Sequence, residues 1–189
     1  SGSGSFALGT LPSGVSGSLD TSGSPIKFVV ATVPVTWNGN VSGAWDIDTT
    51  ANWKFGTLTG LKYPEGTAVT FNDTLGGTSA ITLDTVVNPL SVTFSNNTHI
   101  YSLSGSGYIS GATMLTKTGT NTLIVDTDND YYGGTIHAGG TLQVGNGDTH
   151  GTLGFGSLTN LTGGAIIAFN RTDFISVGNI TRTTVDNSA

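Results

Sequence analysis

The stretch from Met114 to Gly154 constrains the fold more than any other part of the chain. It contains three short segments of β-branched and apolar residues separated by Gly, Asp and Asn: Thr122–Val125, Thr135–His137 and Thr141–Val144. Strands this short form no stable flat sheet alone, but they become stable when each stacks on a similar strand in the next coil. The stretch therefore predicts one coil of a β-solenoid, which needs neighbouring coils to bury its apolar face.

Similar short strand-like segments occur along most of the chain. We find no window with the i, i+3, i+4, i+7 apolar spacing of a helix that is free of Gly, Pro and β-branched residues. An all-β protein is therefore expected, with a β-solenoid as its main part and a β-sandwich as the alternative fold. The remaining predicted strands are Lys27–Val33, Val35–Trp37, Ala68–Asn72, Ala80–Asp84, Leu90–Ser95, Ile100–Ser104, Tyr108–Ser110, Leu115–Lys117, Ser157–Leu161, Ile166–Asn170 and Phe174–Val177.

Changes in composition and in the spacing of the predicted strands divide the chain into three regions. Residues 1–34 begin as a Gly/Ser-rich segment and end in an apolar strand. Residues 35–75 hold all three Trp residues and are expected to form an antiparallel cap. Residues 76–189 carry the more regularly spaced strands and are expected to form the solenoid. The ends of a solenoid present open strand edges and apolar faces, so a cap on one end is physically reasonable.

Composition excludes several kinds of partner. Only 10% of the residues are charged and the net charge is −6, so no basic stripe is available for nucleic acid. The chain has no Cys, which excludes disulfides and thiolate metal sites. No apolar run approaches the ~18 residues of a membrane span. The chain opens SGSGSFALG with no signal peptide, so if it is exported we expect a mature chain or an excised module.

One set of motifs resembles a known family. The segments are Leu115-Thr116-Lys117-Thr118-Gly119, Thr122-Leu123, Tyr132-Gly133-Gly134-Thr135 and Gly139-Gly140-Thr141-Leu142. They resemble the autotransporter-associated β-strand repeat, also called the passenger-associated transport repeat. The segments TWNGNVSGAWDIDTTANW, FALGTLPSGVSGSLD and AFNRTD are similar to recurring segments of large bacterial surface proteins. Two departures occur: Asp126-Thr127-Asp128-Asn129-Asp130 replaces a Ser/Gly/Ala stretch, and Gly139-Gly140 replaces Ala-Gly.

The resemblance implies both a fold and a role. Repeats of this family are understood as coils of a right-handed parallel β-helix in extracellular or cell-surface adhesins, stalks and filaments. Phe6–Val33 resembles a segment that closes one module. The Trp-rich segment TWNGNVSGAWDIDTTANW resembles one that opens the next module. We therefore expect residues 1–34 to pair with the exposed end or edge of another copy or of an adjacent module. Such end-to-end contacts do not close, so they generate filaments.

The aromatic residues of the cap region allow two interpretations. Trp37, Trp45 and Trp53 are evenly spaced, and with Tyr63, Tyr131 and Tyr132 they would suit the CH-rich faces of sugars. A surface of this kind would make the chain a carbohydrate-binding module of a polysaccharide-degrading protein. The favoured interpretation is that the same residues form the core of the cap, because large aromatic rings bury area that a thin solenoid cannot supply.

The acidic stretch also has two interpretations. Asp126, Asp128 and Asp130 alternate and would project to one side of a strand, where with Asn129 they would bind Ca²⁺ through oxygen ligands. The order of residues is not that of an EF-hand loop. A solvated acidic turn is the other interpretation. No cofactor besides Ca²⁺ is expected.

Nothing in the sequence predicts catalysis. His99, His137 and His150 lie far apart, and Glu65 is the only Glu. Arg171 and Asp173 are close in sequence, but no pair of carboxylates has a reason to span a sugar bond. We therefore expect a non-enzyme, with a polysaccharide-active β-helix enzyme as the least favoured alternative. Six sequons would carry glycans on an exported fibre: Asn40, Asn72, Asn96, Asn160, Asn170 and Asn179.

Overall fold

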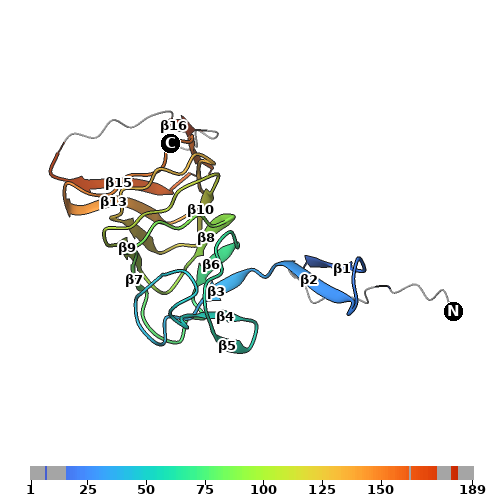
Figure 1. Cartoon of the computed structure of the whole chain (residues 1–189). Coiled ribbons are helices and arrows are strands. Elements are labelled where there is room, and N and C mark those ends of the chain that lie inside the picture. Colours follow the sequence, from blue (N-terminus) through green and yellow to red (C-terminus); the bar gives the residue numbers. More distant parts are fainter. Residues whose placement is uncertain (1–6, 8–15, 162, 174–179, 183–189) are drawn as a thin grey trace.

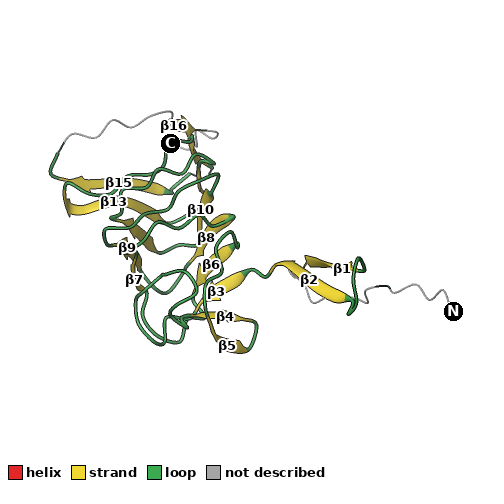
Figure 2. Cartoon of the chain, in the orientation of Figure 1, coloured by secondary structure: helices red, strands yellow, loops and turns green. Residues whose placement is uncertain are grey.

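The computed structural model describes residue 7 and residues 16–161, 163–173 and 180–182. These residues form strands joined by loops, and none of them lies in a helix (Figure 2). The strands are β1 (Ser16–Asp20), β2 (Lys27–Thr32), β3 (Val35–Trp37), β4 (Trp53–Phe55), β5 (Leu58–Leu61), β6 (Val69–Asn72), β7 (Ala80–Thr82), β8 (Ser91–Ser95), β9 (Tyr101–Ser104), β10 (Met114–Thr118), β11 (Thr122–Val125), β12 (Thr135–His137), β13 (Thr141–Asp148), β14 (Leu158–Asn160), β15 (Ile166–Arg171) and β16 (Ile180–Arg182).

Two parallel sheets form the body of the protein, and the chain alternates between them. β8 is followed by β9 and β10 by β11, and like strands pair in parallel within a nine-stranded and a five-stranded sheet. Figure 1 shows the resulting coils lying one above another. Equivalent positions recur every 20 to 23 residues, at Val69, Val92, Leu115, Thr135 and Leu158. The predicted β-solenoid is confirmed, and the β-sandwich is wrong because it would need antiparallel sheets.

The core lies between the two sheets and is built from stacked columns of side chains. In the five-stranded sheet Tyr101, Leu123 and Leu142 are register partners, and all three are buried. In the nine-stranded sheet Val92 and Leu115 are buried partners in the same way. Burial of one such side chain contributes about 1.5–3 kcal/mol, and only the neighbouring coils complete that burial.

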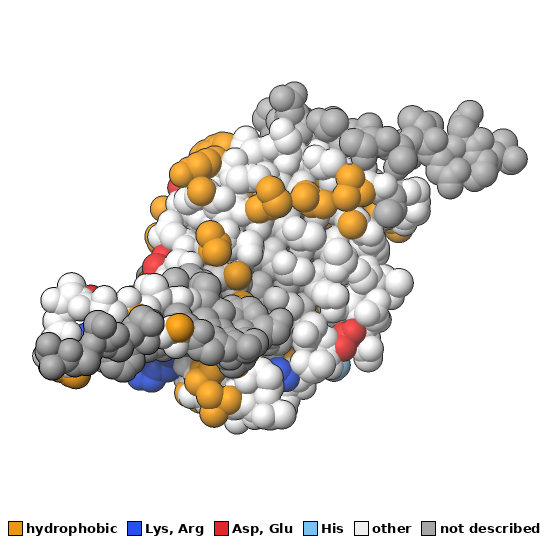
Figure 3. All heavy atoms as spheres, turned by 90° about the vertical axis from the view of Figure 1, so that its right-hand side faces the viewer, with side chains coloured by type: hydrophobic (Ala, Val, Ile, Leu, Met, Phe, Trp, Pro, Cys, Tyr) orange, Lys and Arg blue, Asp and Glu red, His pale blue; other side chains and the backbone are white. Residues whose placement is uncertain are grey.

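A column of threonines lies on the outer face of the nine-stranded sheet. Thr70, Thr93 and Thr116 are register partners, and the column continues through Ile136 to Thr159. β-Branched side chains pack well on a pleated surface, which explains the abundance of Thr in strands here. Figure 3, which views the side where β8 and β10 lie, shows mainly uncharged side chains over this face.

An antiparallel extension covers the first coil. β3 pairs in parallel with β6 but antiparallel with β4, and β4 pairs antiparallel with β5. Gly56 closes the β4–β5 turn with a φ of +57°, a backbone conformation that favours Gly. The predicted antiparallel cap is therefore confirmed. The parallel stack reaches back to β3 and β6, so the coils begin before residue 76.

The N-terminal strands form a separate hairpin. β1 and β2 pair antiparallel as a two-stranded sheet, and Figure 1 shows this hairpin projecting away from the coils. Asp20 stabilises the turn by accepting hydrogen bonds from the backbone N–H and the hydroxyl of Ser22. The hairpin thus lies within the region that the sequence predicts as an N-terminal extension.

Two predicted strands have a different outcome. Tyr108–Ser110 forms no strand: Ile109 makes only an isolated bridge to Val87. The side-chain oxygen of Asn129 accepts the N–H of Ile109, which replaces a bond that a regular ladder would make. The segment Phe174–Val177 lies outside the described residues.

Candidate functional sites

The aromatic residues predicted to stack on sugars are buried. Trp37, Trp45, Trp53 and Tyr63 each expose 0% of their surface. A sugar ring needs an exposed aromatic face, so the structure contradicts the stacking surface and supports the cap-core interpretation. Of the other two aromatic residues in that group, Tyr131 is buried and Tyr132 is 67% exposed.

Trp53 is the centre of this aromatic core. Its ring centroid lies 5.1 Å from that of Trp37, 5.5 Å from that of Trp45 and 5.5 Å from that of Phe71. Phe71 in turn stacks on Phe94 of the next coil at 4.4 Å. The cap and the coils therefore share one continuous core.

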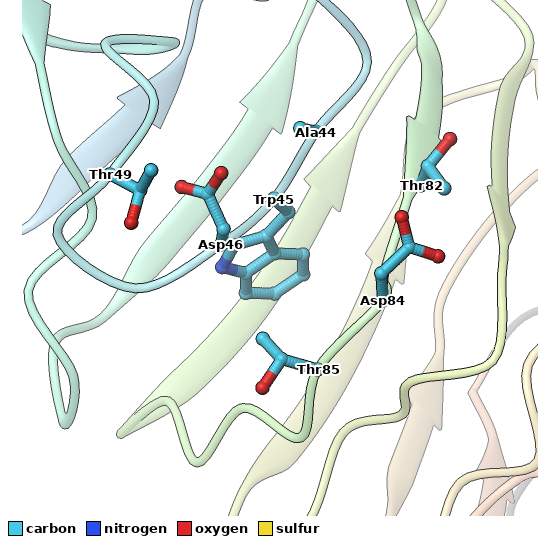
Figure 4. Close-up of a pocket in the computed structure, with 7 residues that line it drawn as sticks. All are labelled: Ala44, Trp45, Asp46, Thr49, Thr82, Asp84 and Thr85. Carbon is cyan, nitrogen blue, oxygen red and sulfur yellow. The ribbon is translucent and has the colours of Figure 1, made fainter.

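A pocket lies beside the aromatic core, where the first coil meets β7. It has a volume of about 290 Å³, and Figure 4 shows the Trp45 indole between Asp46 and Thr49 on one side and residues of the next coil on the other. The full lining is Ala44, Trp45, Asp46, Thr49, Thr82, Asp84 and Thr85.

Backbone and side-chain hydrogen bonds fix the walls of this pocket. The N–H of Trp45 donates to the carbonyl of Thr82, and the N–H of Thr82 donates to the carbonyl of Gly43. The Asp46 carboxylate accepts the N–H of Thr50 at 2.7 Å and its hydroxyl at 2.5 Å. The pocket is therefore formed by segments that do not depend on a ligand for their position. The sequence indicated no link between Asp46 and Asp84, which lie in different coils.

The three aspartates predicted to bind Ca²⁺ do project to one side, because Thr127 and Asn129 between them are buried. The Asp128 carboxylate already accepts two hydrogen bonds from the protein. The donors are the Nδ1–H of His150 at 2.8 Å and the backbone N–H of Gly151 at 3.0 Å. Asn129 is turned inward and donates to the carbonyls of Thr127 and Thr152. Asn129 is therefore not available as a ligand.

These aspartates belong to a charged corner of the coils rather than to a ligand set. Arg171 pairs with Asp173 at 2.8 Å and lies 3.9 Å from Asp128. Burial and the nearby Asp148 raise the pKa of Asp126. Within the described part of the chain, no three His, Cys, Asp or Glu side chains are arranged to hold a metal ion.

Two titratable residues lie in the core, where the sequence predicted none. The inward column of the nine-stranded sheet passes from Phe71 and Phe94 to Lys117 and His137, and both polar side chains expose 0% of their surface. The Lys117 ammonium donates to the carbonyls of Thr118, Gly119 and Gly139 at 2.6, 3.0 and 3.2 Å. All three of its N–H donors are thus used.

Burial changes the acid–base behaviour of both side chains. Desolvation lowers the pKa of Lys117 to about 8, and it also lowers the pKa of His137. The His137 Nε2 lies 3.1 Å from the carbonyl of Gly139, to which Lys117 also donates. Lys117 therefore holds the corner between β12 and β13 to the coil below, and His137 contacts the same carbonyl from within its own coil.

We expect the protein to become more stable as the pH rises from about 8 to about 10. In this range the folded state releases the Lys117 proton, whereas the unfolded chain keeps it until its ordinary pKa near 10.5. The urea midpoint, measured between pH 7 and pH 9.5, should rise in the native protein and stay flat in Lys117→Met. Higher pH is avoided because burial raises the pKa of Tyr131 to about 12, which has the opposite effect. An equal rise in both proteins would contradict this assignment.

The predicted sequons differ in accessibility. Asn40 and Asn170 are exposed, whereas Asn72 and Asn160 are half-buried. Asn96 is fully buried, and its amide nitrogen donates to the carbonyls of His99 and Thr122. The structure therefore contradicts glycosylation of Asn96 in the folded chain. Asn179 lies outside the described residues.

Comparison with protein-family models, with curated proteins and with solved structures finds no match to this chain. The likeness to the autotransporter-associated repeat thus rests on its motif residues alone. Among the described residues, no helix is long and apolar enough to span a membrane.

Proposed function

We propose that the chain is a non-catalytic structural module of an extracellular or cell-surface protein, such as an adhesin, a stalk or a filament. In this proposal the β-solenoid forms a stiff rod that joins end to end with copies of itself or with adjacent modules. One observation carries the proposal: an antiparallel extension at β3 covers one end of the coil stack, whereas at the other end β15 is the edge strand of the five-stranded sheet (Figure 1).

The edge strand β15 has the properties of a joining surface. It pairs with β13, and within the described residues one row of its backbone groups has no second strand as a partner. Ile166 is 56% exposed and Phe169 is 43% exposed along the same strand. An open edge that also carries apolar side chains favours strand addition.

The β1–β2 hairpin supplies a strand that would reach such an edge. Its two strands pair only with each other within the described residues, and it projects from the side of the molecule near β3. Because the hairpin and β15 are different surfaces, their contact would be heterologous and would extend into a filament.

The residues that resemble the autotransporter-associated repeat support this role. Leu115 and Leu123 are core residues, and Lys117 fixes a corner between coils. These three motif residues thus contribute to coil stacking, which is what a repeated building unit requires. The same motif gives the proposal its extracellular location.

The alternative, a carbohydrate-binding module that stacks sugars on the Trp faces, has no support because those faces are buried. For the enzyme alternative, catalysis at a sugar bond needs two carboxylates placed across that bond. The charged corner pairs its carboxylates with His150 and Arg171 instead.

We expect the full chain to form elongated assemblies as its concentration rises. Sedimentation velocity and negative-stain electron microscopy would measure the size and shape of these assemblies. Both Phe169→Lys and removal of residues 1–34 should keep the chain monomeric. Phe155→Lys is the matched control, because Phe155 is 84% exposed but lies off the edge strand, and it should assemble like the native chain. A native chain that stays monomeric at high concentration would refute the proposal.

A further inference from the structure

The chain contains two Asn-Gly pairs, and the fold places them in opposite environments. One is Asn38-Gly39, which follows β3, and the other is Asn146-Gly147, which lies near the end of β13. In an Asn-Gly pair the backbone nitrogen of Gly can attack the preceding side-chain amide, because Gly has no Cβ to hinder the approach. Exposure and backbone freedom therefore decide which of the two pairs reacts.

The Asn146-Gly147 pair lies in an open part of the coil. The register between β13 and β15 shifts between Val144 and Asp148, as in a β-bulge, so the ladder skips residues 145–147. Asn146 and Gly147 are both exposed. Gly147 has a φ of +94°, and a Cβ placed on it would meet no atom within 4 Å. The peptide that joins the two residues thus has room to turn toward the Asn146 side chain.

The Asn38-Gly39 pair is held inside the cap. Asn38 is 5% exposed, and the N–H of Gly39 donates to the carbonyl of Asn52 at 2.9 Å. A Cβ placed on Gly39 would lie 2.4 Å from the carbonyl oxygen of Thr78 in the next coil. The nitrogen that would attack is therefore already bonded, and the backbone around it is tightly enclosed.

We propose that Asn146 is a self-modification site, at which the exposed side-chain amide becomes a carboxylate without an enzyme. The Gly147 nitrogen loses its proton and bonds to Cγ of Asn146, which is an intramolecular attack between neighbouring groups. The Cγ–Nδ2 bond breaks, and the amide leaves as ammonia, which carries the proton away. Water then opens the resulting succinimide at either carbonyl and gives aspartate or isoaspartate. Water is the only co-reactant, and no atom is oxidised or reduced.

The modification adds a negative charge to the charged corner of the coils. Burial raises the pKa of Asp126, and the charge of Asp148 raises it further, while the backbone of Asn146 contacts the same carboxyl group. A new carboxylate at Asn146 disfavours ionisation of Asp126 in the same way, because like charges repel. This site goes beyond the structural role, since it changes the surface charge of the rod with time.

Peptide mapping by mass spectrometry measures both Asn-Gly pairs in one sample of the native chain. During incubation at mildly alkaline pH, the peptide that contains Asn146 should gain the mass difference between an amide and an acid. Part of its product should be isoaspartate, which only the succinimide route gives. Asn38 should react much more slowly, because attack there first requires loss of the buried Gly39 hydrogen bond.

Concentrated urea supplies the control for neighbouring residues. The rate of each pair in the native chain is divided by its own rate in urea, where the fold no longer protects either pair. This ratio should be about tenfold or more larger for Asn146 than for Asn38, which corresponds to at least about 1.4 kcal/mol of difference in barrier. Asn146→Gln keeps a neutral amide but moves its carbonyl carbon one bond farther from the Gly147 nitrogen, so its peptide should stay unmodified.

Three results would overturn the proposal. The first is an equal ratio for the two pairs, which would mean that the fold does not expose Asn146 selectively. The second is a product that contains aspartate without isoaspartate, which would indicate direct hydrolysis of the amide. The third is the same mass gain in the corresponding peptide of Asn146→Gln, which would place the modification on another residue.

Discussion

Trp53→Ala should lower the free energy of unfolding by about 3–5 kcal/mol, the range found when a large aromatic side chain is removed from a core. The Trp53 ring is fully buried and contacts Trp37, Trp45 and Phe71, so its removal opens a cavity where the cap meets the first coils. Urea denaturation followed by circular dichroism measures the loss.

Val41→Ala is the matched control for this change. Val41 lies in the same cap region, but it is 61% exposed, so its truncation should alter the free energy of unfolding by no more than about 0.5 kcal/mol. If Trp53→Ala cost no more than Val41→Ala, the aromatic core would not be what stabilises the cap.

Gly154→Ala should destabilise the coil stack by about 3 kcal/mol, at the upper end of what overpacking costs. A Cβ at Gly154 would lie 1.9 Å from the carbonyl oxygen of Tyr131 in the coil below. That carbonyl also accepts the N–H of Phe155 at 2.8 Å, so it cannot move away without loss of a bond between coils. The φ of Gly154 lies outside the left-handed region, so the penalty comes from the contact alone.

Gly23→Ala controls for the general effect of replacing Gly. A Cβ at Gly23 would meet no atom within 4 Å, and its φ is also outside the left-handed region. The urea midpoint of this variant should match that of the native chain. An equally mild effect of Gly154→Ala would mean that the coils are not packed as closely as described.

The strands of the solenoid were predictable because their cause is local. Val35–Trp37 and Thr135–His137 coincide with β3 and β12, since β-branched residues bounded by Gly or Asn favour short strands in any context. β4 and β5 were not predicted. Their residues form strands because β3 offers an antiparallel partner, and that pairing is a tertiary effect.

The candidate sites were harder to predict, because each joins residues of different coils. Strand alternation places Lys117 on the same side as Leu115, which is the signal that could have revealed it as buried. Its carbonyl partner Gly139 belongs to the next coil. The even spacing of the three Trp residues left both a sugar-stacking surface and a cap core open. Only the closure of the cap over their rings decides between them.

Contacts between methyl and aromatic side chains in nuclear Overhauser spectra test the stacked coils most directly. The parallel stack predicts contacts from Leu123 to both Tyr101 and Leu142, and from Leu115 to Val92. Contacts that reverse along the strands, with Thr122 next to Val144 in place of Val125, would show antiparallel sheets and would contradict the solenoid on which every proposal above depends.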